Sequence, residues 1–294
     1  MQELSVRGLD QRHERPPRAS SRTHRRKPLD LTFARRLHAY EGEIAERETR
    51  AAAEAQDLRF LSARLTRVRM AFEYRRLVAV YQPIVDLRTG ATRGYEALSR
   101  FQLDPLRPPD QWFAEADAAG LGPELEMHAI RSAIKSRHRL PTGTYLSVNV
   151  SPKTLLSQGF AALLQSLDGE PLVVEVTEHS AVEDYDELKR AIDQFRARGV
   201  RLAIDDLGTG FASFMHIVKL LPEFMKLDLS LTRDIEADAV KQALTAALVG
   251  FASQIGAHLI AEGVETVEEM QTLKSLGVEC AQGYYLGAPA PPPV

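Results

Sequence analysis

Acidic side chains stand at the ends of short apolar runs throughout this 294-residue chain. Glu175, Asp205 and Glu262 each lie at the end of such a run, and Glu178 and Asp206 follow within three residues. A parallel β-barrel brings the C-terminal ends of its strands to one face, and the active sites of such barrels lie there. The spacing therefore predicts that carboxylates far apart in the sequence meet at one barrel mouth.

Three further polar residues extend this pattern. Asn149 and Lys226 end two more apolar runs, and Glu96 lies just before Ala97 and Leu98. Each polar residue by itself could equally be a core residue with a polar partner. Gathered at one mouth, the carboxylates would repel one another unless cations neutralised them. Oxygen ligands without histidine or cysteine favour Mg²⁺ or Mn²⁺ over zinc. The predicted ligands are Glu96, Asn149, Glu175, Asp205, Asp206 and Glu262.

The number of carboxylates predicts two metal ions rather than one. Two ions about 4 Å apart can hold a phosphate oxygen and lower the pKa of a shared water, which is the chemistry of phosphodiester hydrolysis. Lys226 could orient that water or stabilise charge in the transition state, or it could simply form an ion pair with Asp228 or another acid. Arg100 could bind a phosphate through its planar guanidinium, or it could be a surface arginine.

The Asp205–Asp206 pair requires a bend in the chain. Adjacent residues of a strand point to opposite faces, so both carboxylates reach one site only where the strand ends. Gly208 and Gly210 follow at once and permit such a bend. We expect residues 207–210 to form a loop that closes over a ligand. The alternative for this motif alone is an ordinary acidic turn.

The bulk composition bounds the class of protein. Apolar residues make up 44% of the chain, which is enough for a core, and the net charge of −3 argues against general nucleic-acid binding. The single cysteine, Cys280, cannot form an internal disulfide, which fits a reducing compartment. No apolar run approaches the roughly 18 residues of a membrane span, and no secretory signal is evident. A cytoplasmic location is expected.

Three segments differ in composition. Residues 1–28 are rich in arginine, proline and serine, which predicts a disordered basic tail. Residues 29–76 are rich in helix formers and predict a helical or coiled-coil segment. Residues 77–294 alternate strand and helix signals and form the predicted barrel domain.

The helical segment carries an apolar seam with alternating steps of four and three residues, which is typical of a coiled coil. Arg47 and Glu54 interrupt the seam, and its stronger half covers 58–72. We expect this helix to pair with a second copy and form a homodimer; the alternative is a helix packed on its own barrel. The seam comprises Phe33, Leu37, Tyr40, Ile44, Arg47, Ala51, Glu54, Leu58, Leu61, Leu65, Val68 and Phe72.

The barrel segment predicts an α/β fold, a (β/α)8 TIM-like barrel, because eight strand signals with intervening helices fit its size and rhythm. An open doubly wound sheet is the alternative, but no glycine-rich phosphate loop follows the first strand. The short turn 86–90 predicts a hairpin and hence one antiparallel strand. The helices include 184–198, 237–254 and 266–275. The strands are 78–84, 94–99, 144–150, 172–177, 201–205, 223–227, 257–261 and 278–282.

Ordered motifs over residues 66–289 resemble the EAL domain family of bacterial cyclic di-GMP phosphodiesterases. A three-residue motif alone would mean little, but seven in order with family-like intervals are specific. The segment from Val80 to Val85 precedes them and also fits. The motifs are Glu96-Ala97-Leu98, Asn149-Val150-Ser151-Pro152, Glu175-Val176-Thr177-Glu178, Asp205-Asp206-Leu207-Gly208, Lys226-Leu227-Asp228, Glu262-Gly263-Val264-Glu265 and Gln282-Gly283-Tyr284.

The resemblance implies a barrel with two Mg²⁺ or Mn²⁺ ions that hydrolyses cyclic di-GMP to linear pGpG. It implies that Glu96, Asn149, Glu175 and Asp205 bind one ion and that Asp205, Asp206 and Glu262 bind the other. Catalytic roles fall on Lys226, which would contact the attacking water, on Glu178, which would steady the loop 207–210, and on Glu96. The implied nucleotide-binding residues are Gln82, Leu98, Arg100 and Gln282, with Glu265 and Asp228 as weaker candidates.

One position departs from the family pattern, which usually has phenylalanine where this chain has Leu207. Loss of ring packing there could weaken loop closure, dimer contacts or metal binding. This leaves a second hypothesis, a non-catalytic module that senses cyclic di-GMP, and a third, a scaffold in which the helical segment acts and the barrel is passive. Since no predicted ligand is missing, the active enzyme is the favoured hypothesis.

Overall fold

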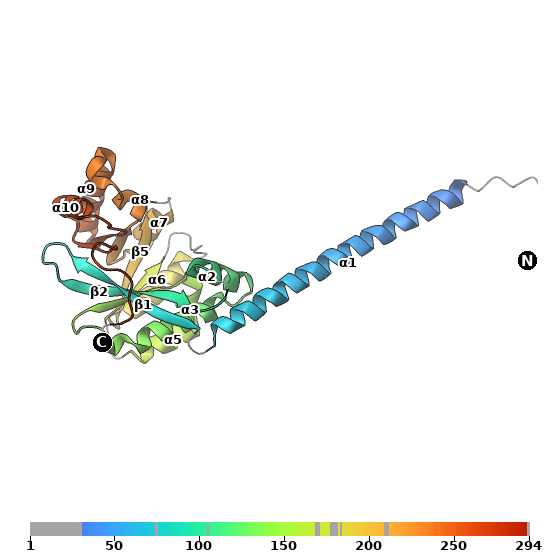
Figure 1. The fold of residues 1–294 in the computed structure, drawn as a ribbon, viewed down its shortest axis with the longest axis horizontal. Coiled ribbons are helices and arrows are strands. Elements are labelled where there is room, and N and C mark those ends of the chain that lie inside the picture. Colours follow the sequence, from blue (N-terminus) through green and yellow to red (C-terminus); the bar gives the residue numbers. More distant parts are fainter. Residues whose placement is uncertain are drawn as a thin grey trace, which may run out of the picture. The chain divides into compact units, whose positions relative to one another are not determined.

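The computed structural model describes residues 31–73, 76–104, 106–167, 171–176, 182, 184–208 and 212–292. The predicted basic tail 1–28 and the predicted site residue Glu178 lie outside these residues. The chain forms a closed barrel of eight strands with helices between them (Figure 1). The strands are β1 (Leu77–Asp86), β2 (Thr92–Phe101), β3 (Tyr145–Asn149), β4 (Leu172–Val176), β5 (Arg201–Leu207), β6 (Phe224–Leu227), β7 (His258–Ala261) and β8 (Cys280–Ala281).

Ten α-helices and two short 3-10 helices occur in the described residues. The α-helices are α1 (Leu31–Ala71), α2 (Pro109–Ala118), α3 (Gly122–Lys135), α4 (Pro152–Leu155), α5 (Gln158–Gln165), α6 (Tyr185–Arg196), α7 (Ala212–Leu220), α8 (Leu229–Thr232), α9 (Ala239–Ile255) and α10 (Val267–Ser275), and the 3-10 helices are η1 (Arg137–Arg139) and η2 (Ile235–Ala237). The predicted helices 184–198, 237–254 and 266–275 correspond to α6, α9 and α10.

The strands follow one another around the barrel in sequence order, and β1 closes it against β8. β1 runs antiparallel to both neighbours, while β2 to β8 are parallel. The hairpin after β1 is stabilised by Asp86, whose Oδ1 accepts hydrogen bonds from the backbone N–H groups of Arg88 and Thr89. The predicted barrel with one antiparallel strand is therefore confirmed.

Helix termini follow local sequence signals. Asp184 and Asp238 cap α6 and α9, their side chains accepting hydrogen bonds from backbone N–H groups of the first turn. Gly256 ends α9 with a φ of 75°, a conformation that glycine adopts without strain. Thr266 and Glu269 form a reciprocal capping box at the start of α10. These signals place each helix so that the next strand returns to the barrel.

The predicted last strand, 278–282, is shorter in the structure and covers only Cys280–Ala281. Gly283 follows soon after, and a Cβ there would overlap the backbone of Val264. The chain thus turns past the backbone after β7 at close range. This approach keeps the residues that follow β7 and β8 together at the mouth.

Two layers of packing surround the strands. Residues that point outward pack with the helices in the main core, for example Val174, Leu202 and Met225. Residues that point inward form a separate apolar cluster inside the barrel. Gly94 lies beside this inner cluster, because a Cβ at Gly94 would overlap the ring of Tyr145. The inner cluster comprises Ile84, Tyr145, Val173, Ala203, Phe224, Ile260 and Cys280.

The last turns of α1 pack on the barrel domain. Val68 and Ala71 are fully buried in a cluster that includes Phe101 of β2 and Trp112 of α2. Arg67 of α1 pairs with Glu115 of α2, and Arg107 pairs with the second carboxylate oxygen of Glu115 at 3.0 Å. This cluster joins the end of α1 to the strand that carries Glu96.

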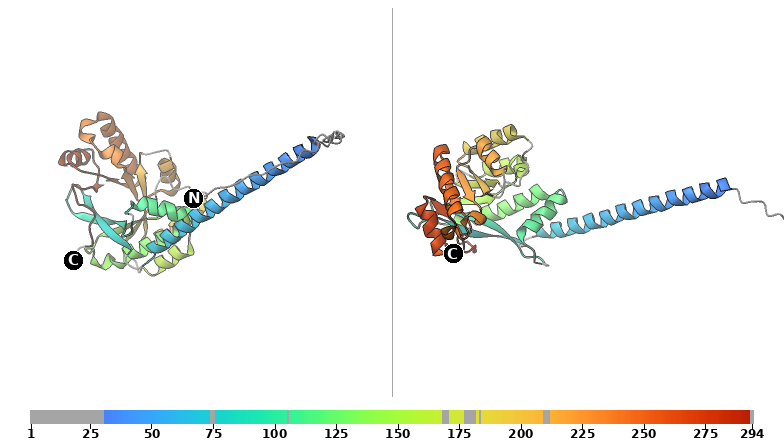
Figure 2. Two further views of the ribbon diagram at one scale, coloured as in Figure 1. Left: turned by 45° about the vertical axis from the view of Figure 1, so that its right-hand side comes forward. Right: turned by 90° about the horizontal axis from the view of Figure 1, so that it is seen from above.

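The chain divides into two units, residues 1–57 and 58–294, and α1 is one continuous helix through the boundary (Figures 1 and 2). Its seam residues Phe33, Leu37 and Tyr40 are exposed, as are Leu58 and Leu61. Among the helices of the described residues, none combines the length and the apolar character that crossing a membrane requires.

Candidate active site

A ring of polar side chains lies directly above the apolar inner cluster. Each strand contributes one polar residue to the ring. On β3 to β8 it follows the residue of the inner apolar cluster by two positions, and on β2 it follows Gly94 by two positions. On β1, which runs in the opposite direction, it comes two positions before Ile84. Glu262 and Gln282 follow the last residues of β7 and β8, and the others lie within strands. The ring consists of Gln82, Glu96, Ser147, Glu175, Asp205, Lys226, Glu262 and Gln282. The barrel thus changes from apolar to polar within one layer, at the C-terminal ends of the parallel strands.

Lys226 is the hub of this ring and is fully buried. Its ammonium Nζ pairs with four carboxylates, at 2.6 Å from Glu262 Oε1, 2.7 Å from Glu175 Oε2, 3.2 Å from Asp205 Oδ1 and 3.5 Å from Glu96 Oε2. The alternative expectation for Lys226, an ion pair with Asp228 or another acid, is met by these four acids and not by Asp228. Asp228 instead caps α8, accepting a hydrogen bond of 2.9 Å from the backbone N–H of Ser230.

One ammonium faces four carboxylates in this ring, and their burial shifts the pKa values further. Burial raises the pKa of Glu175 to about 8, and the charge of Glu96 adds to this shift. Burial also raises the pKa of Glu262 well above its ordinary value, although Lys226 opposes the shift. The pKa of Glu96 is lowered, because Lys226 and two amide donors outweigh its burial. The site therefore favours additional positive charge.

Asp205, Asp206 and Glu262 offer carboxylate oxygens within 4.8 Å of one another. Asp206 has a φ of 58°, so the chain leaves the extended conformation there, as the paired aspartates require. Leu207 is fully buried, and its side chain belongs to the main core. The aliphatic residue at this position thus packs in the barrel wall.

Amide side chains hold the Glu96 carboxylate from two sides. Asn149 Nδ2 donates to Oε1 at 3.0 Å, and Gln282 Nε2 donates to Oε2 at 2.5 Å. Gln282 Nε2 also lies 3.3 Å from Glu262 Oε1. Gln82 donates to the backbone oxygen of Gly287 at 3.1 Å, which ties the ring to the C-terminal segment. Glu96 is therefore fixed in orientation at the mouth.

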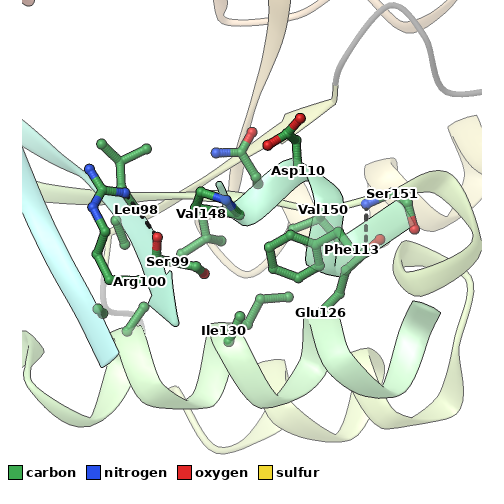
Figure 3. A pocket seen from close by; sticks show the side chains of 16 residues that line it. Leu98, Ser99, Arg100, Asp110, Phe113, Glu126, Ile130, Val148, Val150 and Ser151 are labelled. Atoms are coloured by element: carbon green, nitrogen blue, oxygen red, sulfur yellow. Dashed lines mark hydrogen bonds between the residues drawn. The ribbon is translucent and has the colours of Figure 1, made fainter. Parts of the chain in front are cut away.

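One cavity lies beside the mouth, lined in part by Asn149, and a second lies over the ring itself. The first, of about 380 Å³, lies between β2 and β3 on one side and α2 and α3 on the other (Figure 3). Its walls are largely apolar, with Phe113 and Ile130 among them, and Arg100 and Asp110 are at its edge (Figure 3). The Arg100 guanidinium donates to the backbone oxygen of Ser99 at 2.9 Å.

The second cavity, of about 360 Å³, opens directly over the acidic ring. Leu98 lines both cavities, so it separates one from the other. Glu265 lines the second cavity and pairs with Arg233 at 3.1 Å. The lining also includes Gln82, Glu96, Asp205, Glu262, Gln282 and Tyr284.

The structure gathers all six predicted metal-binding side chains and Lys226 near one mouth, and it places Gln82, Leu98 and Gln282 beside them. Arg100 lies at the edge of the first cavity, and the Asp228 carboxylate is engaged at the start of α8. Sequence reasoning missed Ser147, whose hydroxyl donates to Glu175 Oε1. Its position two residues before Asn149 on the same strand was the available signal.

The donor chemistry fits a divalent cation. The donor atoms of Asp205, Asp206 and Glu262 are carboxylate oxygens only, which hard cations such as Mg²⁺ and Mn²⁺ prefer. A closed α/β-barrel whose mouth gathers four carboxylates around one lysine, with Asp206 close to two of them, defines a class of barrel with an acidic site suited to cations. The EAL domain model matches residues 65–289, and the chain belongs to the EAL domain family.

The chain is similar in sequence to relatives with known names over 236 to 238 residues. The chain is 34% identical over 238 residues to the cyclic di-GMP phosphodiesterase PdeR of Escherichia coli, which is 77% of this chain and 36% of the relative. It is 31% identical over 236 residues to the bifunctional diguanylate cyclase/cyclic di-GMP phosphodiesterase MucR of Pseudomonas aeruginosa, covering 76% and 34% of the two chains. The chain thus spans about a third of the length of these relatives.

Solved structures share the fold. The PaMucR phosphodiesterase in complex with c-di-GMP has a TM-score of 0.67 and 30% identity, covering 78% of this chain and 98% of that one. A manganese and cy-diGMP complex of Klebsiella pneumoniae BlrP1 has a TM-score of 0.66 and 29% identity, covering 74% and 56% of the two chains.

Proposed function

We propose that this chain hydrolyses one phosphodiester bond of cyclic di-GMP and releases linear pGpG. The observation that carries the proposal is the buried ammonium of Lys226 among the carboxylates of Glu96, Glu175, Asp205 and Glu262. The names of the relatives and the ligands in the titles of the solved structures support the same reaction.

Two Mg²⁺ or Mn²⁺ ions are proposed as cofactors. Bound there, they would neutralise the carboxylates, polarise a phosphate oxygen and make a water acidic enough to attack at neutral pH. We assign Glu96, Asn149, Glu175 and Asp205 to one ion and Asp205, Asp206 and Glu262 to the other. Glu96 suits this role because Asn149 and Gln282 already fix its orientation.

The chain's own residues supply binding and charge. Lys226 holds an ammonium where it can donate a hydrogen bond to the attacking water and stabilise charge that develops on the phosphate. A cyclic dinucleotide has two bases, and the two cavities on either side of Leu98 suit a ligand with two lobes. Arg100 and Gln282 are the proposed polar contacts to it, with Gln82, Glu265 and Asp228 as further candidates.

Glu178 keeps the role that the family resemblance implies, which is to steady the loop 207–210. Asp228 is not a member of the ring, and its carboxylate caps the start of α8, so its proposed contact with the nucleotide is from outside the ring. Homodimerisation through α1 is also proposed, because its apolar seam residues Phe33, Leu37, Tyr40, Leu58 and Leu61 are exposed. The cytoplasmic location stays a prediction.

Incubation of the purified chain with cyclic di-GMP and Mn²⁺, followed by chromatography, tests the proposal. Linear pGpG is the expected product, and Glu96→Ala should form none while remaining folded. Tight binding without product would instead identify a sensor module. Wild-type turnover in Glu96→Ala would contradict the assignment of this residue as a metal ligand.

A further inference from the structure

We propose that Ser147 is a positioning residue for Glu175, and that its hydroxyl holds one carboxylate oxygen so that the other is presented to a cation. The inference rests on the proposed function and concerns a residue outside the predicted site. It follows from the contacts of Glu175 inside the barrel.

Glu175 uses both carboxylate oxygens in the structure. Ser147 donates to Oε1, and Lys226 donates to Oε2 at 2.7 Å. The two donors, Ser147 and Lys226, are 1% and 0% exposed and Glu175 is 1% exposed, so water does not replace either donor. The two oxygens are therefore held by different kinds of group, one neutral and one cationic.

The difference between the two donors determines which oxygen can bind a cation. A cation that approaches Oε2 meets the ammonium of Lys226, which also pairs with Asp205 and Glu262 and so has other carboxylates to bind when a cation takes its place at Oε2. A hydroxyl at Oε1 adds no positive charge to the site and so does not repel the cation. Ser147 thus restrains the carboxylate plane while leaving Oε2 as the exchangeable oxygen.

The barrel itself fixes the position of Ser147. Its neighbours two residues away on β3 are Tyr145 in the apolar cluster below and Asn149 at the mouth above. A side chain without a donor at this level would leave Oε1 of a buried carboxylate without its hydrogen bond, which is costly. Groups that orient metal ligands in this way typically change metal affinity about 10- to 100-fold when removed.

Four variants separate the hydroxyl from the packing. Ser147→Ala removes the hydroxyl. Threonine and valine have the same shape as each other, so Ser147→Thr and Ser147→Val differ only in whether a hydroxyl is present. Thr245→Val is the matched control, since the Thr245 hydroxyl is buried on α9 and has no hydrogen-bond partner in the described structure. The probe is Mn²⁺ alone, with free and bound ion measured by electron paramagnetic resonance.

We expect Ser147→Ala and Ser147→Val to bind Mn²⁺ about 10- to 100-fold more weakly than the wild type. Ser147→Thr and Thr245→Val should stay within a few-fold of it. Equal affinity in the wild type and Ser147→Ala, equal weakening in the threonine and valine variants, or no Mn²⁺ binding by the wild type would each overturn the inference. If Ser147→Val does not fold, Ser147→Cys replaces it as a side chain of similar size and weaker donor strength.

Turnover of cyclic di-GMP is measured separately on the same samples. Weaker Mn²⁺ binding in the variants together with an inactive wild type would refute the proposed function and leave the positioning role intact. An active wild type with unchanged Mn²⁺ binding in all variants would refute the positioning role alone.

Discussion

At the scale of single residues, Lys226 is the main source of countercharge for the acidic ring. Burial lowers the pKa of this lysine, but the surrounding carboxylates, Asp205 first among them, raise it well above its ordinary value. The ammonium therefore stays charged although it has no access to water. This makes Lys226 a structural requirement of the metal-free barrel as well as a proposed catalytic group.

Replacement of Lys226 by methionine should separate these two roles. Removing one partner of a buried charge network leaves uncompensated carboxylates, and we expect the free energy of unfolding without metal to fall by about 3–5 kcal/mol. Mn²⁺ should then stabilise the variant more than the wild type, because it supplies the missing positive charge. Chemical denaturation with and without Mn²⁺ measures both effects.

Lys153→Met is the control for this prediction. Lys153 pairs with Asp117 at 3.5 Å, but both side chains are more than 60% exposed. Its loss should change stability by less than about 1 kcal/mol. A Lys226→Met protein as stable as this control would show that the ring does not depend on the ammonium.

At the scale of elements, Glu269 connects the start of α10 to its surroundings. Its carboxylate accepts hydrogen bonds from the backbone N–H groups of Asp234, Glu265 and Thr266. Burial raises the pKa of Glu269, but these hydrogen bonds outweigh it and the net shift is downward. The ionised carboxylate thus stabilises the loop that follows Glu262.

The lowered pKa predicts a pH dependence with a definite sign. The stabilisation by Glu269 is present above the unfolded pKa, about 4.3 for glutamate, and is lost as the pH falls through the lower folded value. Glu269→Gln should cost about 1–3 kcal/mol at pH 7, with a smaller difference from wild type below pH 4. Urea denaturation across this pH range measures the difference in stability.

Glu268→Gln is the control, because Glu268 lies in the same turn but is exposed, and this variant should show a much smaller loss at pH 7. An equal loss in both variants would contradict the role of Glu269.

Two glycines in different elements should respond oppositely to alanine. In Gly94→Ala the new methyl group would meet the Tyr145 ring inside the barrel, and we expect a loss of about 1–3 kcal/mol. Gly250 is exposed within α9 and has open space around it, so Gly250→Ala should gain up to about 1 kcal/mol. Thermal unfolding compares the two. A Gly94→Ala protein as stable as the wild type would mean that the Tyr145 ring moves aside at little energetic cost.

The strand rhythm made the barrel predictable, but the contacts inside it were not. Runs that end in Glu175, Asp205 and Lys226 indicate strands from their apolar residues alone. The strand register decides that Lys226 meets four carboxylates rather than Asp228, and spacing along the sequence does not contain that register. Ser147 could have been placed on the face of Asn149 from their spacing of two residues, but its bond to Glu175 depends on the register of β3 and β4, which the spacing does not contain.

At the scale of the whole molecule, the two units contribute different surfaces. The barrel buries its apolar residues in three clusters. In the helix α1, by contrast, the seam residues Phe33, Tyr40 and Leu58 are each more than 60% exposed. A row of large apolar side chains on one helix face is typical of a surface that pairs with another helix. The interruptions Arg47 and Glu54 weaken the seam in its middle, so we expect the exposed seam residues on either side of them, Phe33 to Ile44 and Leu58 to Leu61, to contribute most of the pairing energy.

Substitution at Leu58 and Leu61, the last exposed leucines of the seam before the part that packs on the barrel, tests this pairing. Leu58→Glu together with Leu61→Glu introduces like charges at successive seam positions of both helices, so self-association should fall at least tenfold, which corresponds to about 1.4 kcal/mol. Ala53→Glu adds a charge at an exposed position of α1 outside the seam and should leave self-association unchanged. Sedimentation equilibrium at micromolar concentration distinguishes a dimeric wild type and control from a monomeric double variant.

Because the two leucines are exposed and do not belong to the barrel's buried clusters, thermal unfolding of the barrel should be the same in all three proteins. A wild type that is monomeric at this concentration would mean that the seam of α1 does not pair two copies of this chain.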